Sequence, residues 1–216
     1  MKYRLTPKTI TYNGIELHQI EALKDFGAIR KGDKGGYIEA ERNLSQLDDC
    51  WVCVDAKVYS NAEVYGNTVV CDNAEVCGNA VVCSNAVVYG NAEVCGNAVV
   101  YGNAEVYGNA VVCDNAVVYD NAVVYGNAVV YGNAKVCGNA KVESMCDYIV
   151  FKNWWSSGRF FTWTRSNNMW KVGCFYGTGE ELIEKAYVDS DLSGREYKRI
   201  VDYVESILQE EKGGEK

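Results

Sequence analysis

A six-residue phrase repeats without interruption through the middle of the chain, and it constrains the fold more than any other feature. Fourteen consecutive hexads run from Asn61 to Ser144 and approximate the pattern N-A-x-V-[Y/C]-[G/D/S]. Three looser hexads precede them and begin at Asn43, Asp49 and Asp55. Repeats of this kind are typical of a solenoid, in which each unit buries its apolar side chains against its neighbours.

The hexad predicts a very short strand followed by a corner. Within A-x-V-[Y/C] the side chains alternate, so Ala and Val point into the protein while x and Tyr or Cys point outward. Gly or Asp followed by Asn supplies the corner, because these residues tolerate a left-handed backbone. Strands this short cannot pair as hairpins, so each strand must pair with one a full coil away. Valine and tyrosine are also too abundant for a disordered segment. We therefore predict an all-β solenoid.

The phrase resembles the hexapeptide repeat of left-handed parallel β-helices. The stretch "VYGNTV" at 64–69 matches the aliphatic first position and the small fifth position of that family's pattern. It departs at the second position, where Tyr65 replaces the usual small or acidic residue. The resemblance implies a left-handed helix with three hexads per coil, and therefore five to six coils. The segment "GDKGGYIEAERNLS" further resembles hexapeptide-repeat proteins of bacteriophages and prophages, which implies a phage-encoded protein in the host cytoplasm.

With three hexads per coil, residues 18 apart stack on one outer face. One face is apolar on its outside, and Cys83 lies on it beside the valines and tyrosines. Because an apolar face of this extent is rarely left to water, we predict an interface between copies of the chain. Its residues are Val81, Val99, Val117, Tyr101 and Tyr119. The resemblance implies a trimer, and closed symmetric homo-oligomers are the common arrangement.

Ten cysteines raise the question of disulfides or metal. Seven share the outer hexad position with tyrosine: Cys53, Cys71, Cys77, Cys83, Cys95, Cys113 and Cys137. Because that position accepts either residue, we predict free thiols that act as small apolar side chains. Cys50 and Cys53 form a C-x-x-C, but no second pair completes a zinc ribbon. We therefore expect no metal, no cofactor and a reducing, cytoplasmic compartment.

Many hexapeptide-repeat proteins are acyltransferases, and that family resemblance implies a histidine as general base. The single histidine here is His18, which precedes the repeat, and no loop interrupts the hexads. We therefore expect no enzyme, and the repeat is interpreted as a scaffold. An acyltransferase with an atypical base stays an alternative.

The two ends of the chain differ from the repeat in composition. Residues 1–36 are predicted to form a β cap with two strands around Asn13-Gly14, residues 37–144 the β-helix, and residues 145–216 a small α+β domain. That domain is predicted to contain three strands ("DYIVFKN", "RFFTWT" and "MWKVGCF") and two helices. Capping boxes are expected at Thr178 and Ser193.

The net charge of −8 argues against binding of long nucleic acid or an anionic membrane. Yet residues 149–178 contain no Asp or Glu, and they hold four cations and four of the five tryptophans. Cations among aromatic rings suit an anionic, π-bearing ligand such as a nucleotide. The predicted ligand surface comprises Trp154, Trp155, Arg159, Trp163, Arg165, Trp170 and Lys171. The alternative is that these aromatics build the core of a small domain.

These features together predict a non-enzymatic homo-oligomeric binding protein whose β-helix multiplies copies of the C-terminal domain. Phage-borne oligomers that resemble this design include proteins that sequester nucleotide immune signals. We therefore take an anti-defence sponge as the most specific hypothesis. A structural or virion-associated scaffold with a protein partner is the first alternative.

Overall fold

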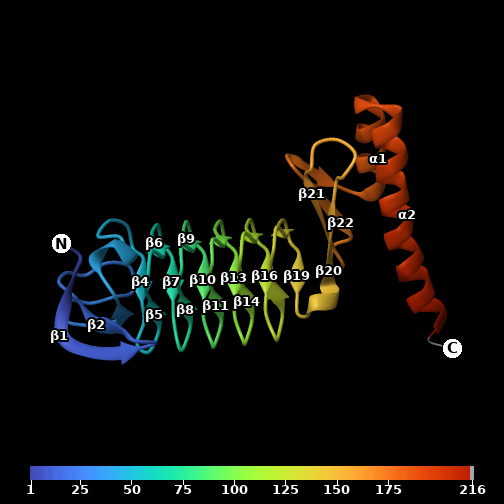
Figure 1. The fold of residues 1–216 in the computed structure, drawn as a ribbon. Helices are drawn as coiled ribbons and strands as arrows, with labels where there is room; N and C mark the ends of the chain where they lie inside the picture. Colours follow the sequence, from blue (N-terminus) through green and yellow to red (C-terminus); the bar gives the residue numbers. More distant parts are fainter. Residues whose placement is uncertain (215–216) are drawn as a thin grey trace. The chain divides into compact units, whose positions relative to one another are not determined.

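The computed structural model describes residues 1–214 and divides into two compact units (Figure 1). The solenoid unit comprises Met1–Tyr148 together with the loop Arg165–Asn167. The C-terminal unit comprises Ile149–Thr164 and the residues from Asn168 onward. Residues 215 and 216, which the predicted C-terminal domain includes, lie outside the described residues. Among the described helices, none is long and apolar enough to cross a membrane.

The repeat forms a parallel β-solenoid of about six turns, as predicted. Val87 pairs with Val69 in the preceding coil and with Glu105 in the following coil, so one coil takes 18 residues. Three hexads per coil are thereby confirmed, and the coils stack along one axis in Figure 1.

Three rows of two-residue strands form the three sides of the solenoid. The valine face consists of β6 (Glu63–Val64), β9 (Val81–Val82), β12 (Val99–Val100), β15 (Val117–Val118) and β18 (Lys135–Val136). The tyrosine face consists of β4 (Trp51–Val52), β7 (Val69–Val70), β10 (Val87–Val88), β13 (Glu105–Val106), β16 (Val123–Val124) and β19 (Lys141–Val142). The glutamate face consists of β5 (Lys57–Val58), β8 (Glu75–Val76), β11 (Glu93–Val94), β14 (Val111–Val112) and β17 (Val129–Val130).

The interior of the solenoid is filled by alanine and the inward valine of each hexad. Ala98 and Val100 are fully buried, whereas Val99 between them points outward and is half-buried. The predicted alternation is confirmed throughout the repeat. Small and medium apolar side chains fill the core because three strands converge on it in every coil.

The corners use left-handed residues, as predicted. Gly66 has φ 76°, and a Cβ there would lie 2.7 Å from the carbonyl oxygen of Ser84 in the next coil. Asp72 adopts φ 58°, and its carboxylate accepts a hydrogen bond from the backbone N–H of Gly90 at 3.1 Å. Asparagine amides add ladders along the corners, for example from Asn79 to Asn97 at 3.0 Å.

The amino-terminal cap is an antiparallel hairpin of β1 (Tyr3–Tyr12) and β2 (Ile15–Ala22). Asn13 and Gly14 both have positive φ, which confirms the predicted turn. The strand β3 (Lys34–Ile38) pairs with β2 on one side and with β5 on the other, and so joins the cap to the first coils. A short 3-10 helix, Glu41–Asn43, follows β3.

The side chain of Lys2 is buried at the cap end of the solenoid. It is 1% exposed, and its ammonium donates hydrogen bonds to the carbonyl oxygens of Cys50 at 2.7 Å and Leu47 at 3.1 Å. The same ammonium lies 5.1 Å from the ring centroid of Phe26. A buried cation therefore satisfies carbonyl groups that the first coils leave open.

One pair of outer cysteines is bonded, so the prediction that all of them are free thiols was wrong. Cys53 and Cys71 form a disulfide on the tyrosine face, with their Cα atoms 4.6 Å apart. Stacking of one hexad position in successive coils brings these atoms within the range that a disulfide needs. Within the described residues, the other eight cysteines form no disulfide.

The C-terminal unit is an antiparallel sheet with two helices. Its strands are β20 (Tyr148–Lys152), β21 (Phe160–Thr164), β22 (Met169–Val172) and β23 (Phe175–Gly177). Its helices are α1 (Gly179–Asp189) and α2 (Asp191–Gly214). The prediction of three strands was wrong, because a left-handed turn at Gly173, with φ 56°, divides the last one into β22 and β23.

Of the two predicted capping boxes, the structure contains one. Thr178 and Glu181 form the expected capping box at α1, with hydrogen bonds of 2.9 and 3.3 Å. The box predicted at Ser193 is absent, because α2 already begins at Asp191. The hydroxyl of Ser190 instead accepts a hydrogen bond from the N–H of Ser193 at 3.1 Å.

Replacing Gly66 by Ala should destabilise the solenoid much more than replacing Gly132. Both glycines have positive φ, so each change costs about 1–2 kcal/mol in backbone strain. The added methyl meets nothing within 4 Å at Gly132, whereas at Gly66 it meets the backbone of the next coil. We expect Gly66→Ala to cost a further ~1–3 kcal/mol in urea unfolding. Equal losses for the two variants would contradict this packing.

Replacing Lys2 by Ala should lower the free energy of unfolding by about 1–3 kcal/mol, because buried carbonyl groups lose their donor. Lys24→Ala serves as the matched control, since Lys24 is an exposed lysine of the same cap. Thermal unfolding of both variants measures the difference. An unchanged melting temperature in Lys2→Ala would show that the ammonium does not stabilise the cap.

Candidate ligand-binding site

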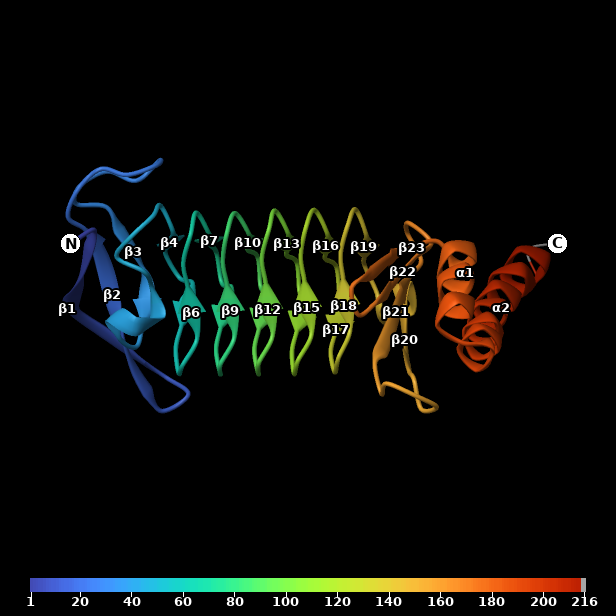
Figure 2. The ribbon, with the colours of Figure 1, turned by 90° about the horizontal axis from the view of Figure 1, so that it is seen from above.

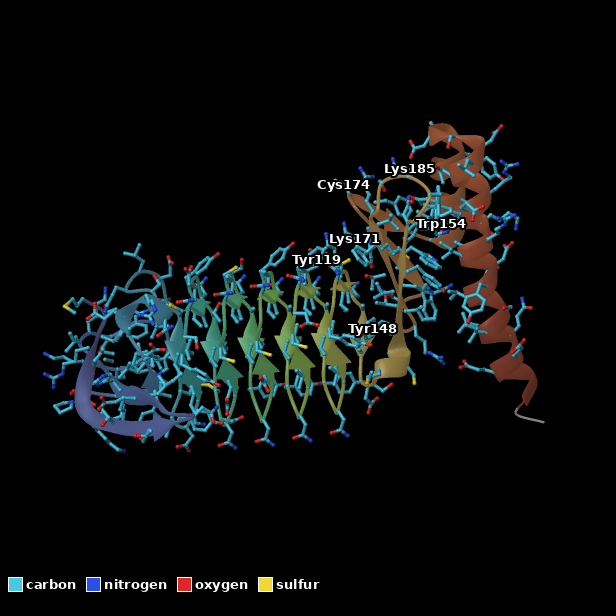
Figure 3. The ribbon with its side chains drawn as sticks, in the orientation of Figure 1. Tyr119, Tyr148, Trp154, Lys171, Cys174 and Lys185 are labelled. Atoms are coloured by element: carbon cyan, nitrogen blue, oxygen red, sulfur yellow. A yellow bond between two sulfur atoms is a disulfide. The ribbon has the colours of Figure 1, made fainter. Side chains whose placement is uncertain are left out.

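The C-terminal unit contains a cavity of about 260 Å³. Its lining comes from the end of the β20–β21 loop, from β22, β23 and the turn between them, and from both helices. The lining residues are Arg159, Val172, Cys174, Phe175, Leu182, Lys185, Ala186, Asp189 and Tyr197. Cys174 from the turn and Lys185 from α1 are labelled in Figure 3.

The β20–β21 loop holds Arg159 at the cavity. The buried side chain of Asn153 organises this loop and donates to the hydroxyl of Ser156 at 2.8 Å. The backbone N–H of Asn153 also donates to the carbonyl oxygen of Arg159 at 2.7 Å. The guanidinium lies across Gly173, where an added Cβ would approach the Arg159 Cδ to 3.4 Å.

The charges of the cavity are mixed but favour an anion. Arg159 and Lys185 supply two cations, and Asp189 supplies one carboxylate. Burial raises the pKa of Tyr197, although Asn153 and Arg159 act in the opposite direction. The Tyr197 phenol is therefore protonated at neutral pH and can donate a hydrogen bond. A guanidinium, an ammonium and a phenol are donors that suit phosphate or carboxylate oxygens.

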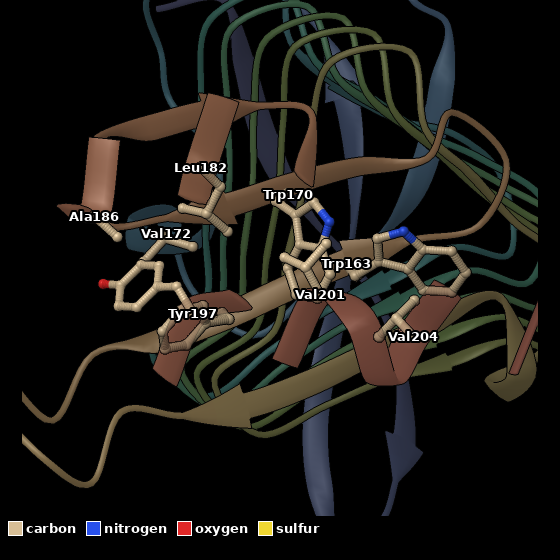
Figure 4. Packing of buried hydrophobic residues seen from close by; sticks show 9 residues of the cluster. Trp163, Trp170, Val172, Leu182, Ala186, Tyr197, Val201 and Val204 are labelled. Carbon is tan, nitrogen blue, oxygen red and sulfur yellow. The ribbon is translucent and has the colours of Figure 1, made fainter. Parts of the chain in front are cut away.

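Two of the predicted binding aromatics belong to the core instead. Trp163 is 1% exposed and Trp170 is 2% exposed, and both pack with apolar side chains of the two helices (Figure 4). The Trp163 indole N–H donates to the Asn168 side chain at 2.8 Å. The prediction that they contact a ligand was wrong, because α1 and α2 cover the sheet face on which they lie. The alternative of core aromatics is confirmed for this pair.

The neighbouring tryptophans of the β20–β21 loop do not line the cavity. Trp155 is half-buried, and its ring lies 6.1 Å from Phe161 and 5.7 Å from Tyr197. Trp154 is 79% exposed and packs edge-on against Trp155 at 6.0 Å. Trp155 thus supports Tyr197, while Trp154 projects from the loop (Figure 3).

The other two predicted cations lie elsewhere. Arg165 belongs to a loop of the solenoid unit, and its backbone N–H donates to the carbonyl oxygen of Asp147 at 2.8 Å. Lys171 is half-buried on β22, between Thr162 and Tyr176 of the adjacent strands. Of the predicted ligand surface, Arg159 alone lines the cavity.

Sequence reasoning missed the cavity residues on the helices. Lys185 and Asp189 flank the buried Ala186 on α1, and Tyr197 opens the apolar stripe of α2. Tyr197 belongs to the apolar periodicity of α2, and such a periodicity indicates packing and not ligand binding. The segment without acidic residues ends before α1, so it did not point to Lys185.

The five residues of the predicted interface do lie together on the valine face, whose strands form one row in Figure 2. Val81, Val99 and Val117 are half-buried and point outward. The rings of Tyr101 and Tyr119 stack with their centroids 4.9 Å apart. Association through this face stays a prediction.

No group of three or more His, Cys, Asp or Glu side chains is placed to hold a metal within residues 1–214. Cys77, Cys95 and Cys113 follow one another on the glutamate face. Burial raises the pKa of all three, so they are neutral thiols at ordinary pH.

Comparison with protein families finds a similarity in the solenoid. Residues 112–126 and 116–132 match the family described as the YdcK Beta solenoid repeat. No curated protein matches the chain. The coils from β14 to β17 are thus similar to a known β-solenoid repeat, in agreement with the fold.

Proposed function

We propose that the protein is a non-enzymatic binding protein whose C-terminal unit holds a small anion in the cavity at Arg159 and Lys185. The convergence of these two cations on one cavity, in a chain of net charge −8, supports the proposal most directly. Asp189 offsets one of the two charges, so the cavity suits an anion that also offers a donor or an apolar group.

The cavity narrows the class of ligand. A volume of about 260 Å³ lies just below that of drug-sized sites, which start at ~300 Å³. Val172, Phe175 and Leu182 supply an apolar wall, and the cations supply the polar end. A nucleotide would place its phosphate here and its base outside, because Trp163 and Trp170 offer no stacking surface. Sequestration of a nucleotide signal by a phage-borne protein in the host cytoplasm is the most specific form of this proposal, and it rests on the resemblance.

In this proposal the solenoid brings copies of the cavity together. The valine face supports self-association, because half-buried valines and stacked tyrosines leave an apolar strip that a second copy would cover. Linked copies raise the apparent affinity for any target that carries more than one anionic group.

A scaffold with a protein partner, virion-associated or not, is the second candidate. The junction of α1 and α2 exposes Tyr187, Val188 and Leu192, with Val188 86% exposed. Exposed apolar groups of this kind are typical of protein contacts. An acyltransferase with His18 as its base has no such observation in its favour.

Replacing Arg159 or Lys185 by Ala should weaken anion binding by about tenfold or more, because a hydrogen bond to a charged group contributes ~1.5–3 kcal/mol. Titration calorimetry with inorganic phosphate, adenosine monophosphate and cyclic mononucleotides provides the measurement. Lys171→Ala is the matched control, since it removes a cation of the same unit that does not line the cavity. The proposal fails if no probe binds, or if the control loses as much affinity as the cavity variants.

Replacing Val99 by Lys should shift the protein towards monomers, because the added charges would meet an apolar surface. Val111→Lys provides the control, since Val111 occupies the equivalent outward position on the glutamate face. Light scattering across a concentration series measures the mass. Wild-type protein that stays monomeric at every concentration would contradict self-association.

A further inference from the structure

We infer that two copies pack through their valine faces with antiparallel solenoid axes, related by a two-fold axis that runs along β12. This inference rests on the proposed self-association and specifies its geometry. The five strands of the face place β12 at the centre, with two strands on either side (Figure 2).

The outer column of the valine face is self-complementary. Along the solenoid it consists of Glu63, Val81, Val99, Val117 and Lys135. The three valines are half-buried, and the oppositely charged residues at the two ends are exposed. A two-fold axis along β12 reverses the order of the coils and keeps the columns aligned. It therefore places Glu63 against Lys135 of the second copy, Val81 against Val117, and Val99 against itself.

The second outer column of the valine face is also matched with itself by this two-fold rotation. It consists of Tyr65, Cys83, Tyr101, Tyr119 and Cys137. The axis places Tyr65 against Cys137 of the second copy, Cys83 against Tyr119, and Tyr101 against itself. Cys83 is 9% exposed and Cys137 is 3% exposed, and Tyr65 and Tyr119 of the same column interact with them. The tyrosine rings thus form most of the surface of this column, and the central Tyr101 side chains of the two copies meet each other.

The outer columns of the tyrosine face and the glutamate face are not self-complementary. The outer column of the tyrosine face has six members, and an antiparallel pairing places the carboxylate of Glu105 against Val87. On the glutamate face the same operation places Glu93 against itself. An unpaired carboxylate in an apolar contact, or two facing carboxylates, costs free energy that the valine face avoids.

The trimer that the resemblance implies would bring different columns together. A three-fold axis parallel to the solenoid keeps the coils of all copies in the same direction and packs the valine face on a different face of its neighbour. The facing strands then run in opposite directions, so the valine column of one copy meets the second outer column of its neighbour. The matching of valine with valine, and of Glu63 with Lys135, is therefore specific to the two-fold dimer.

The size of the face predicts a weak dimer. Five strands about 4.8 Å apart span only ~20 Å. The face buries on the order of several hundred Å² per copy, less than the ~800 Å² of a standard interface. The exposed end charges therefore set orientation and register more than affinity, and dimerisation should depend on concentration.

Charge exchange between the two ends tests the arrangement. Glu63→Lys and Lys135→Glu each convert two attractive contacts per dimer into repulsive ones, and each should weaken dimerisation on the order of tenfold. The double variant Glu63→Lys with Lys135→Glu restores both attractions and should dimerise like the wild type. Sedimentation velocity over a concentration series gives the dissociation constants. If the two solenoids packed with parallel axes, Glu63 of one copy would not contact Lys135 of the other. The double variant would then not recover dimerisation.

Glu105→Lys is the control, because it makes the same charge change on the tyrosine face and should leave the dimer unchanged. Circular dichroism and the melting temperature confirm that every variant is folded. The inference is overturned if the double variant is as weak as the single ones, or if the wild type is a trimer. If the wild type is a trimer and Val99→Lys dissociates it, self-association is still upheld. If the wild type is a monomer, both the self-association and the two-fold arrangement are overturned. Anion binding by the C-terminal unit is measured separately in either case.

Discussion

The backbone hydrogen bonds between successive coils are the constraint on which the solenoid depends. The N–H of Val99 donates to the carbonyl oxygen of Ala116 at 3.0 Å, and Asn97 bonds to Asp114 in the same way at 2.6 Å. Because each coil must present its donors directly opposite the acceptors of the next, every coil needs the same length of 18 residues. A single inserted residue would move inward side chains to the outside for the rest of that coil. The unbroken run of hexads follows from this requirement.

Fixed coil length also forces like residues to stack on like, with effects that differ by residue type. Asparagine amides gain hydrogen bonds, tyrosine rings gain stacking contacts, and a pair of cysteines forms a disulfide. Stacked carboxylates are unfavourable, and Glu75 and Glu93 are neighbours on the glutamate face. Tyr12 of the cap hairpin and Tyr59 both donate to the Glu75 carboxylate. The bond to Glu75 raises the pKa of Tyr12 to about 12, so the phenol keeps its proton at neutral pH.

The C-terminal unit follows a different principle, since its contacts do not repeat. The apolar stripe of α2 and two residues of α1 cover one face of a four-stranded sheet, and the large tryptophans fill the space between them. At the edge of this packing, the β20–β21 loop and α1 place Arg159 and Lys185 on the lining of one cavity. The repeat thus presents long rows of stacked side chains, and the non-repeating unit presents a cavity.

The sequence by itself determined the solenoid, its 18-residue coil, the inward and outward positions, the cap hairpin and the two helices. These features follow from periods and turn residues that act over a few neighbours, so they can be recognised without the fold. Only the tertiary structure decided that Trp163 and Trp170 are core, that Gly173 splits a predicted strand, and that Arg159 and Lys185 line one cavity. It also showed that Cys53 and Cys71 are bonded. These outcomes depend on which segments, distant along the chain, come to lie against one another, and no local pattern specifies that choice.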